Sequence, residues 1–416
     1  MRIACVGGGP AGLYFAILMK LWRPESDVTV FERNKEGVTH GWGVTMERGF
    51  LATLAGLDAE SAAEIEGSSV RWQHQVVSFR GERDVNHDNG DACGISRQRF
   101  VDILAARARQ LGVDLRYERE VRDAAELPEA DLIVAADGVN SQLRVGRAGF
   151  GTTLRAGRNK YTWLGTSKVY EQFNFFFERT EAGWIWAYAY RHEPAASTFV
   201  VECAPGTWTA LGFDNGTASA ALDRLEEIFG AHLDGHQLTA QFPDGTDARW
   251  QNFRTVGNER WQDGRVVLVG DSAHTAHFSV GLGTTLALED VIALAARLRA
   301  GGTEAGLEPA LRAYAEQRRS ELSQHAIEAA RSAAWFESLP RYAALPPRDF
   351  AAVLHSRRAP LLPHLPPRLF CQLNRARARF GALDAVRTLV SRLPVPREPG
   401  TGARRGAHPG QPVTGA

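Results

Sequence analysis

Residues 2–22 read RIACVGGGPAGLYFAILMKLW, and this stretch decides the fold. A short apolar run is followed at once by glycines and then by a segment whose apolar residues have helical spacing. A second apolar run, DVTVFER, occupies residues 27–33. The order of strand, glycine turn, helix and strand predicts a βαβ unit that opens a parallel sheet.

The glycines of this turn have the spacing of a dinucleotide-binding motif. Gly7, Gly9 and Gly12 form G-x-G-x-x-G directly after the strand, and Glu32 lies 20 residues past the last glycine. The first glycine permits a tight turn, the second lets a pyrophosphate approach the backbone, and the third lets the helix pack on the strand. Glu32 is placed to accept a hydrogen bond from a ribose hydroxyl. The motif predicts a dinucleotide site, and it does not distinguish NAD from FAD.

Two later apolar runs also end in polar motifs. ADLIVAADGVNSQLR (130–144) places Asp137 and Gly138 after a buried strand, and RVVLVGD (265–271) places Gly270 and Asp271 after another. Helical spacing appears at about 97–111, from the glycine pair at 281 and 283 to about Leu298, and from 308 to 339. The nucleotide-type segments are therefore far apart in the chain.

The segments between these motifs differ from them in amino-acid composition. From about 158 to 255 the stretches KYTWLGT, FNFFFER, GWIWAYAYR and STFVVEC are rich in aromatic and β-branched residues. Their pattern predicts antiparallel strands. We therefore expect one nucleotide-binding domain that is assembled discontinuously around a second, aromatic sheet.

Composition and charge exclude several classes of protein. The 416 residues carry 48 basic and 48 acidic side chains, so no overall field favours nucleic acid or an acidic membrane surface. The four cysteines lack paired spacing, which is typical of buried thiols in a reducing compartment. The N-terminus lacks a signal-peptide pattern, and no apolar run reaches the roughly 18 residues of a membrane span. We expect a cytoplasmic protein with no membrane span and no nucleic-acid partner.

The three motifs, in this order, resemble those of the class A FAD-dependent aromatic monooxygenases of the para-hydroxybenzoate hydroxylase type, which have a single dinucleotide-binding domain. Further segments resemble the subfamily of the salicylyl-CoA and anthraniloyl-CoA hydroxylases and of the hydroxylase of a tryptophan derivative in violacein biosynthesis. These segments are HGWGVTMERGFL (40–51), GRNKYTWLGTSK (157–168), STFVVEC (197–203), HTAHFSVGLGTT (274–285) and AAWFESLPRY (333–342). Phe278 and Thr285 stand where the wider family has proline and asparagine.

The resemblance implies a fold of the α/β (α+β) class. It comprises a Rossmann-like FAD-binding domain with a parallel sheet, an antiparallel-sheet substrate domain and C-terminal helices. We expect the FAD-binding domain at 1–75, 95–157 and 256–300, and the substrate domain at 76–94 and 158–255. A helical region is expected at 301–393. The tail 394–416, rich in Pro, Gly and Arg, is expected to be disordered.

The resemblance also assigns the contacts to FAD. The N-terminal glycines hold its ADP half, the DG motif serves FAD and NAD(P)H together, and the GD motif holds the ribityl and pyrophosphate end. Arg97 opens a helix beside the pyrophosphate, and the GWG loop lies on the other side of the isoalloxazine. The alternative for Arg97 is an exposed arginine at the start of a helix. The alternative for the GWG loop is a plain turn without a cofactor contact. The predicted cofactor-binding residues are Gly7, Gly9, Pro10, Ala11, Gly12, Glu32, Arg33, Gly41, Trp42, Gly43, Arg97, Asp137, Gly138, Gly270, Asp271, Gly281, Leu282, Gly283 and Thr284.

The implied reaction is hydroxylation of an aromatic or heteroaromatic ring through a flavin C4a-hydroperoxide, with NADPH or NADH and O2 as co-substrates. The ring is of the phenol, pyridinol, indole or aryl-CoA type, in natural-product biosynthesis or aromatic metabolism. Trp184, Trp186 and Tyr188 share one strand face and are predicted to line the substrate site, with a place in the hydrophobic core as the alternative for each. The sequence singles out no general base, and His40 and His277 are the candidates that lie beside the flavin motifs.

Several alternatives stay open at this stage. An FAD-dependent dehydrogenase or desaturase would insert no oxygen, and a non-catalytic flavin-binding protein would not turn over. The pair His274 and His277 suggests zinc, but the sequence shows no further cluster of ligands, so we expect no metal. The sequence also leaves open whether copies associate as a homo-oligomer.

Overall fold

The computed structural model describes residues 1–86, 92–240, 249–300 and 306–380. The parallel sheet has the strand order β16-β17-β9-β1-β2-β8, and only the edge pair β16–β17 is antiparallel. Its strands are β1 (Arg2–Val6), β2 (Asp27–Phe31), β8 (Asp114–Arg116), β9 (Leu132–Ala135), β16 (Gln262–Asp263) and β17 (Val266–Leu268). Three segments far apart in sequence thus form one sheet, as the motifs predicted.

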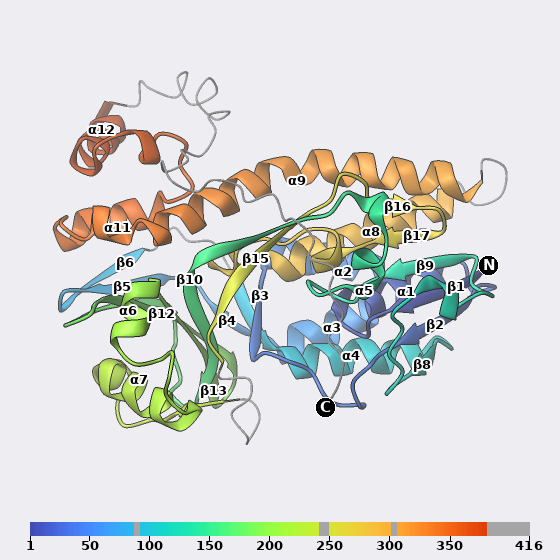
Figure 1. Cartoon of the computed structure of the whole chain (residues 1–416), viewed down its shortest axis with the longest axis horizontal. Helices are drawn as coiled ribbons and strands as arrows, with labels where there is room; N and C mark the ends of the chain where they lie inside the picture. The colour runs from blue at the N-terminus through green and yellow to red at the C-terminus, as the bar shows by residue number, and fades with distance from the viewer. Residues whose placement is uncertain (87–91, 241–248, 301–305, 381–416) are drawn as a thin grey trace, which may run out of the picture.

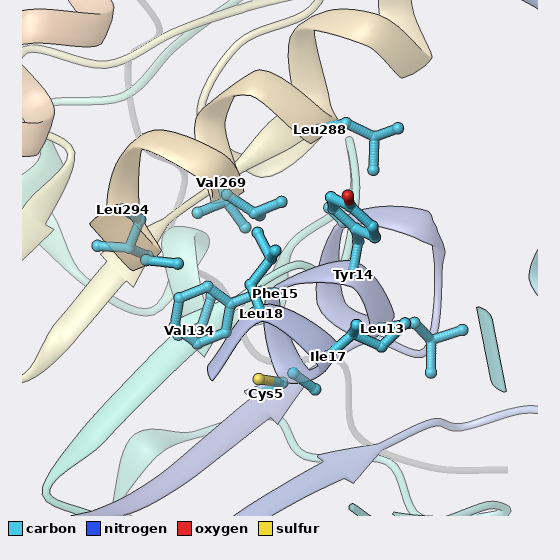
Figure 2. Packing of buried hydrophobic residues seen from close by; sticks show 14 of the residues in the cluster. Cys5, Leu13, Tyr14, Phe15, Ile17, Leu18, Val134, Val269, Leu288 and Leu294 are labelled. Carbon is cyan, nitrogen blue, oxygen red and sulfur yellow. The ribbon is translucent and has the colours of Figure 1, made fainter. Parts of the chain in front are cut away.

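The parallel sheet buries an apolar helix against its strands. Helix α1 (Pro10–Trp22) begins with proline, which suits the first helical position because its missing N–H would have no partner there. Every residue from Pro10 to Met19 is buried, which fits a helix that is apolar on all sides. Figure 2 shows Phe15, Leu18 and their neighbours packed against Val134 of β9 and Leu294 of α8 (Gly283–Ala300).

A large sheet follows, with the order β14-β10-β13-β12-β11-β5-β6 and with β15 paired to β10. Its pairs are antiparallel apart from β11–β5. Its strands are β5 (Gln75–Phe79), β6 (Glu82–Asn86), β10 (Thr153–Thr166), β11 (Phe173–Thr180), β12 (Gly183–Glu193), β13 (Ala196–Cys203), β14 (Leu238–Thr239) and β15 (Gln251–Gly257). A small sheet, β3-β7-β4, lies between the two larger sheets in Figure 1; it comprises β3 (Gly43–Glu47), β4 (Val70–Trp72) and β7 (Ala92–Ser96).

Helices cover both faces of the large sheet. One face packs against α7 (Ala218–Leu233), and the other packs against the end of α9 (Leu307–Glu337) with α10 (Leu339–Tyr342) and α11 (Pro347–His355). Figure 1 shows α9 running along the top of the molecule from the parallel sheet to the large sheet. The remaining helices are α2 (Arg48–Leu57), α3 (Ala59–Ser68), α4 (Arg97–Gln110), α5 (Gln142–Val145), α6 (Pro205–Ala210) and α12 (Pro367–Phe380), with short 3-10 turns at 124–126, 148–150, 270–272, 278–280 and 362–364.

The predicted fold class is confirmed, with a parallel sheet, an antiparallel sheet and C-terminal helices. Sheet membership supports most of the predicted domain ranges, which we retain as a proposal. There are two main exceptions: β7 pairs with β3 and β4 and not with the large sheet, and β10 of the large sheet begins at Thr153, inside the range 95–157. The predicted tail (394–416) lies outside the described residues. So do residues 301–305 and 381–393 of the predicted helical region. Within the described ranges, no helix combines the length and the apolar character that a membrane crossing requires.

Candidate functional site

The glycine turn after β1 is held by close backbone contacts. A Cβ on Gly7, whose φ is +113°, would lie 2.3 Å from the Ala136 carbonyl oxygen, and a Cβ on Gly12 would lie 2.1 Å from the Gly7 carbonyl oxygen. Gly9 differs, since no protein atom lies within 4 Å of its Cβ position. The first and third glycines therefore serve packing, and the second faces open space at the start of α1, where the helix dipole favours an anion.

One side of this turn opens into a cavity of about 410 Å³, here called the ribose cavity. Glu32 lines it, and its carboxylate accepts hydrogen bonds from the backbone N–H of Gly8 at 2.7 Å and of Asn34 at 2.8 Å. Arg33 and His40 lie on the same wall and are exposed. The acid thus stands beside the glycine turn, as its distance along the chain predicted.

The other side opens into a larger cavity of about 720 Å³, here called the main cavity. The two cavities adjoin each other, because Gly9, Arg97, Ala136 and Gly138 line both. Helix α4 brings Arg97 to this junction, where Ser96 caps the helix by accepting from the Arg99 N–H.

Buried polar atoms at the junction lack partners in the described chain. Arg97 Nε and Asp137 Oδ1 are buried without a hydrogen bond, although such groups are normally paired. Burial lowers the pKa of Arg97 and raises that of Asp137. An ordered pyrophosphate and ribose beside them would supply an anion and hydroxyls of the right chemistry. The residues present therefore fit a dinucleotide that spans both cavities.

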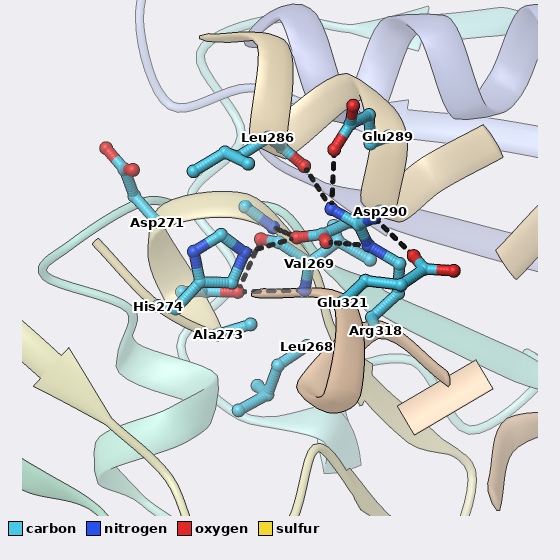
Figure 3. A network of polar contacts seen from close by, with 12 residues as sticks. Leu268, Val269, Asp271, Ala273, His274, Leu286, Glu289, Asp290, Arg318 and Glu321 are labelled. Atoms are coloured by element: carbon cyan, nitrogen blue, oxygen red, sulfur yellow. Dashed lines mark hydrogen bonds and ion pairs between the residues drawn. The ribbon is translucent and has the colours of Figure 1, made fainter. Parts of the chain in front are cut away.

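Asp271 projects into the main cavity from the turn that follows β17. It is exposed to the cavity, and Figure 3 shows its carboxylate pointing away from the polar network behind it. The depth of this position raises the pKa of Asp271, and the charges of His274 and Arg97 act in the opposite direction. Asp271 thus lies between the turn and the cationic junction, where ribose or ribityl hydroxyls would meet it.

The network behind Asp271 is centred on Asp290 of α8, which is completely buried (Figure 3). Its Oδ2 accepts from the Gly270 N–H at 2.9 Å and lies 2.8 Å from His274 Nε2. Its Oδ1 accepts from Arg318 Nε of α9 at 2.8 Å. His274 therefore braces the turn. Within the described residues no group of three or more His, Cys, Asp or Glu side chains could hold a metal ion.

The start of α8 forms the floor of the main cavity. Gly281 has φ +69°, and a Cβ on Gly283 would meet no protein atom within 4 Å. The first N–H groups of a helix have no intrahelical partner, so this floor presents donors and the positive end of the helix dipole. The lining residues here are Gly281, Leu282, Gly283 and Thr284.

An aromatic wall from the large sheet stands opposite this floor. Trp163, Val200 and Tyr188 are cross-strand neighbours on β10, β13 and β12, and all three line the main cavity. The other aromatic members of the wall on the large sheet are Tyr161, Phe173, Phe175, Tyr190 and Phe253, and Phe278 from the turn at 278–280 packs against Tyr161 and Tyr188. A flat ring would therefore bind between aromatic faces and the floor that carries the helix N-terminus.

Comparison with known proteins identifies this arrangement. Residues 1–330 match the model of a family described as FAD binding domain. A salicyloyl-CoA 5-hydroxylase from a Streptomyces species is 38% identical over 82% of this chain and 66% of its own length. The protodeoxyviolaceinate monooxygenase of Chromobacterium violaceum is 31% identical over 87% of this chain and 96% of its own. A solved tetrameric form of 2-methyl-3-hydroxypyridine-5-carboxylic acid oxygenase has the same fold, with a TM-score of 0.64, 21% identity and coverage of 82% and 90% of the two chains.

The chain belongs to the family of FAD-dependent monooxygenases. The family membership, the FAD cofactor and the enzyme class predicted from the sequence are thus confirmed. The individual contacts to FAD stay predictions.

The structure places the predicted flavin residues of this monooxygenase in two groups. Most line one of the two cavities, and four do not: Gly12, Gly41, Trp42 and Gly270. Gly41 backs onto the ring of Trp163, and Trp42 packs over Gly165. Gly12 and Gly270 serve packing, because a Cβ on Gly270 would lie 3.0 Å from Ala287 Cβ. A contact of these four residues with FAD stays a prediction, and their observed contacts are with the protein itself.

The substrate-lining prediction needs a correction for two tryptophans. Tyr188 lines the main cavity, but Trp184 and Trp186 do not. Trp184 stacks on Phe79 with ring centroids 5.1 Å apart, and Trp186 stacks on Phe336 at 5.8 Å. The three residues share one face of β12, but the helices α9 and α11 cover the end of the strand that carries the tryptophans.

The two histidine candidates for a general base also lie outside the main cavity. His40 is exposed at the ribose cavity. His277 is buried behind Phe278, with Nδ1 2.8 Å from Ser279 Oγ, and burial lowers its pKa to about 3. Neither is placed to accept a proton from a ring in the main cavity.

Sequence reasoning missed three residues of the main-cavity region. Arg357 and Arg358, after α11, line the cavity, and nothing in the stretch HSRRAP distinguishes them from surface arginines. Glu202 lies behind the aromatic wall, and here a signal was present. An acid at a buried position of the apolar strand STFVVEC is unusual enough to mark a candidate.

Replacing Asp271 by alanine is expected to weaken FAD binding about 10- to 100-fold, because a hydrogen bond to a charged group contributes about 1.5–3 kcal/mol. Fluorescence titration of the apoprotein with FAD measures this change. Asp263→Ala is the matched control, because Asp263 lies on β16, pairs with Arg147 at 3.0 Å and does not line either cavity. An unchanged dissociation constant for Asp271→Ala would contradict the assignment.

Proposed function

We propose that the chain hydroxylates an aromatic or heteroaromatic ring in the main cavity, with NADPH or NADH and O2 as co-substrates. The observation that carries this proposal is the shared space: one cavity contains both the α8 N-terminus with Asp271 and the aromatic wall. Relatives named for salicyloyl-CoA 5-hydroxylation and for protodeoxyviolaceinate monooxygenation support a ring of the phenol, pyridinol, indole or aryl-CoA type.

Bound FAD supplies the redox chemistry, namely hydride uptake from the nicotinamide and transfer of one oxygen atom from O2. The chain supplies position, charge and exclusion of water. The helix N-terminus at Gly283 stabilises negative charge on whatever group lies above it. The aromatic wall aligns the ring by stacking and keeps water from the reacting atoms.

The decisive experiment follows the oxygen atom. Purified FAD-loaded protein is incubated with NADPH or NADH and a panel of indoles, hydroxypyridines, phenols and aryl-CoA esters under ¹⁸O2. We expect one compound to stimulate O2 uptake and to gain one ¹⁸O atom, as measured by mass spectrometry. An oxidised product without label would show a dehydrogenase instead, and no oxidation of NAD(P)H with any compound would show a non-catalytic flavin-binding protein.

The proposal extends to where the enzyme acts and how it assembles. The four cysteines are free and buried, which supports a reducing, cytoplasmic location. We also propose that the domain given above with the parallel sheet holds the flavin and that the domain with the large sheet holds the ring, which is supported by the main cavity being lined by both. One structural relative is described as a tetrameric form, so self-association of this chain is part of the proposal and is to be measured by light scattering.

A further inference from the structure

Glu202 on β13 is a buried carboxyl with only neutral hydrogen-bond partners. The residue is 1% exposed. Its Oε2 accepts from Tyr188 Oη at 2.6 Å and from Trp186 Nε1 at 3.2 Å, and its Oε1 accepts from Asn159 Nδ2 at 2.7 Å. Among the described residues no Lys, Arg or His lies within ion-pair distance of it. Burying an acid without a cation is costly, and packing alone does not require one here.

The register of the large sheet joins this acid to the main cavity. Tyr161, Glu202 and Trp186 form one cross-strand row, next to the row of Trp163, Val200 and Tyr188 on the same face of the sheet; Tyr161 also lines the cavity, and Glu202 and Trp186 do not. The Tyr188 hydroxyl connects the two rows. It donates to Glu202 and accepts from Trp186 Nε1 at 3.2 Å, which leaves one acceptor lone pair for a further donor.

A cation lies close to the same part of the cavity, over the ring of Phe175, whose centre is 5.5 Å from that of the Tyr188 ring. Arg357 lines the main cavity, is 5% exposed, and donates to three neutral oxygens, those of Ser332 Oγ, Leu354 O and Ser279 O, at 2.8–3.0 Å. Its guanidinium lies 5.5 Å from the centre of the Phe175 ring. No acid pairs with it among the described residues. An anion formed in the cavity would therefore meet a buried positive charge.

We propose that Tyr188 and Glu202 form a proton relay that ionises a hydroxyl group on the aromatic ring, so that the substrate is a hydroxyaryl compound. The substrate O–H bond breaks and leaves its electron pair on the substrate oxygen, while the proton goes to Tyr188 Oη. The proton of Tyr188 goes at the same time to Glu202 Oε2. Tyr188 stays neutral, Glu202 becomes an uncharged acid, and the negative charge moves to the substrate, near Arg357. No electrons are transferred in this step.

This relay deepens the proposed function and rests on it. A ring that carries O⁻ donates more electron density to the carbon that accepts oxygen than a ring that carries OH. Deprotonation by a positioned base contributes about 10²- to 10⁴-fold to a rate. Tyr188 and Glu202 supply the base that the histidines do not.

The surroundings of Glu202 set the pH at which the relay works. Burial raises the pKa of Glu202 to about 7, although the hydrogen bonds from Tyr188, Asn159 and Trp186 act to lower it. Glu202 accepts a proton only when ionised, so turnover should rise as the pH increases through about 7 and then level off. The titratable or charged groups that act on this pair from the neighbouring elements are Tyr161 on β10, Cys203 on β13, Glu337 on α9 and Arg357 after α11.

The first test reads the proton directly, without turnover. The probe is 3-nitrophenol, whose ionised form absorbs visible light and whose pKa lies above that of Glu202, added to FAD-loaded protein between pH 7 and pH 9. We expect the wild type to ionise the bound probe at a pH below the pKa of the free probe without releasing its proton to an unbuffered solution, and both Glu202→Gln and Tyr188→Phe to lose this shift with internal proton transfer. A wild type that neither binds nor ionises the probe, or a shift without proton release that persists in both variants, would overturn the relay.

The second test uses the phenol of the panel that the wild type labels fastest with ¹⁸O. We expect Glu202→Gln and Tyr188→Phe to lower kcat about 10²- to 10⁴-fold at pH 7.5 with little change in KM, and the deficit to shrink above the pKa of the phenol itself. Glu178→Gln is the matched control, because Glu178 lies on β11, next to the strand of Tyr188, contacts His232 at 2.7 Å and does not line the cavity.

The outcomes separate the two proposals. The FAD content and the circular dichroism of each variant must match those of the wild type. Because Glu202→Gln and Tyr188→Phe are chemically different substitutions, one variant that folds is enough to test the relay. If the wild type introduces ¹⁸O only into rings that carry no hydroxyl group, the proposed hydroxylase function would stand and the relay would be overturned. An equal pH profile in wild type and variants would do the same. A wild type that labels nothing would remove the proposed function, whereas the nitrophenol shift would still report on the relay.

Discussion

Replacing Asp290 by alanine is expected to lower the free energy of unfolding by about 3 kcal/mol. Asp290 is completely buried and joins Gly270, His274 and Arg318, so its removal leaves a backbone N–H and a buried guanidinium without their central acceptor. The value lies at the lower end for a broken buried ion pair, because Glu289 still contacts Arg318 at 3.0 Å. Urea unfolding of the purified protein measures the change.

The same substitution should also reduce FAD content, because the turn that Asp290 holds carries Asp271. Glu289→Ala is the control on the same helix. Its side chain is 36% exposed and its pair with Arg318 is partly solvated, so we expect a loss of less than about 1 kcal/mol. Equal losses for the two variants would show that the buried carboxylate has no special role in holding the turn.

Alanine at two glycines of the first turn is expected to separate folding from cofactor binding. Gly12→Ala places a Cβ 2.1 Å from the Gly7 carbonyl oxygen, and neither backbone can move inside the packed unit, so we expect a loss of about 3 kcal/mol or more and little folded protein. Gly9→Ala meets open space, so we expect a stable apoprotein whose FAD affinity falls more than about 10-fold.

Thermal unfolding of the apoproteins and FAD titration measure the two quantities. The glycine pair is its own matched control, because the substitution is identical and the positions are three residues apart. An unstable Gly9→Ala apoprotein, or a Gly12→Ala protein as stable as the wild type, would contradict the division between packing and binding.

The parts of the site that follow from local pattern could be predicted from the sequence. The strand at residues 2–6, the spacing of Gly7, Gly9 and Gly12, and Asp271 after a buried strand each need only neighbouring residues to be recognised. Their functions depend on backbone geometry, which glycine and strand ends determine locally. These predictions therefore agree with where the structure places the residues.

The rest depends on how distant segments pack. Alternation correctly placed Trp184, Trp186 and Tyr188 on one face, but which end of that face stays open depends on where α11 docks. Arg357 reaches the cavity through the same docking, so no local pattern could mark it. Glu202 could have been found, because an acid within an apolar strand breaks the pattern around it.

The discontinuous parallel sheet also imposes an order on synthesis. Strand β1 (Arg2–Val6) is made first and lies at the centre, but β17 (Val266–Leu268), which leads to Asp271, is made about 260 residues later. At ~5–20 residues per second, the ribosome needs on the order of 10–50 s to travel from Gly12 to Asp271. During that interval the nascent chain displays the glycine turn without its partner motif. Flavin loading is therefore a late event in the life of each polypeptide, and a chain that stalls before residue 271 is left with an incomplete nucleotide site.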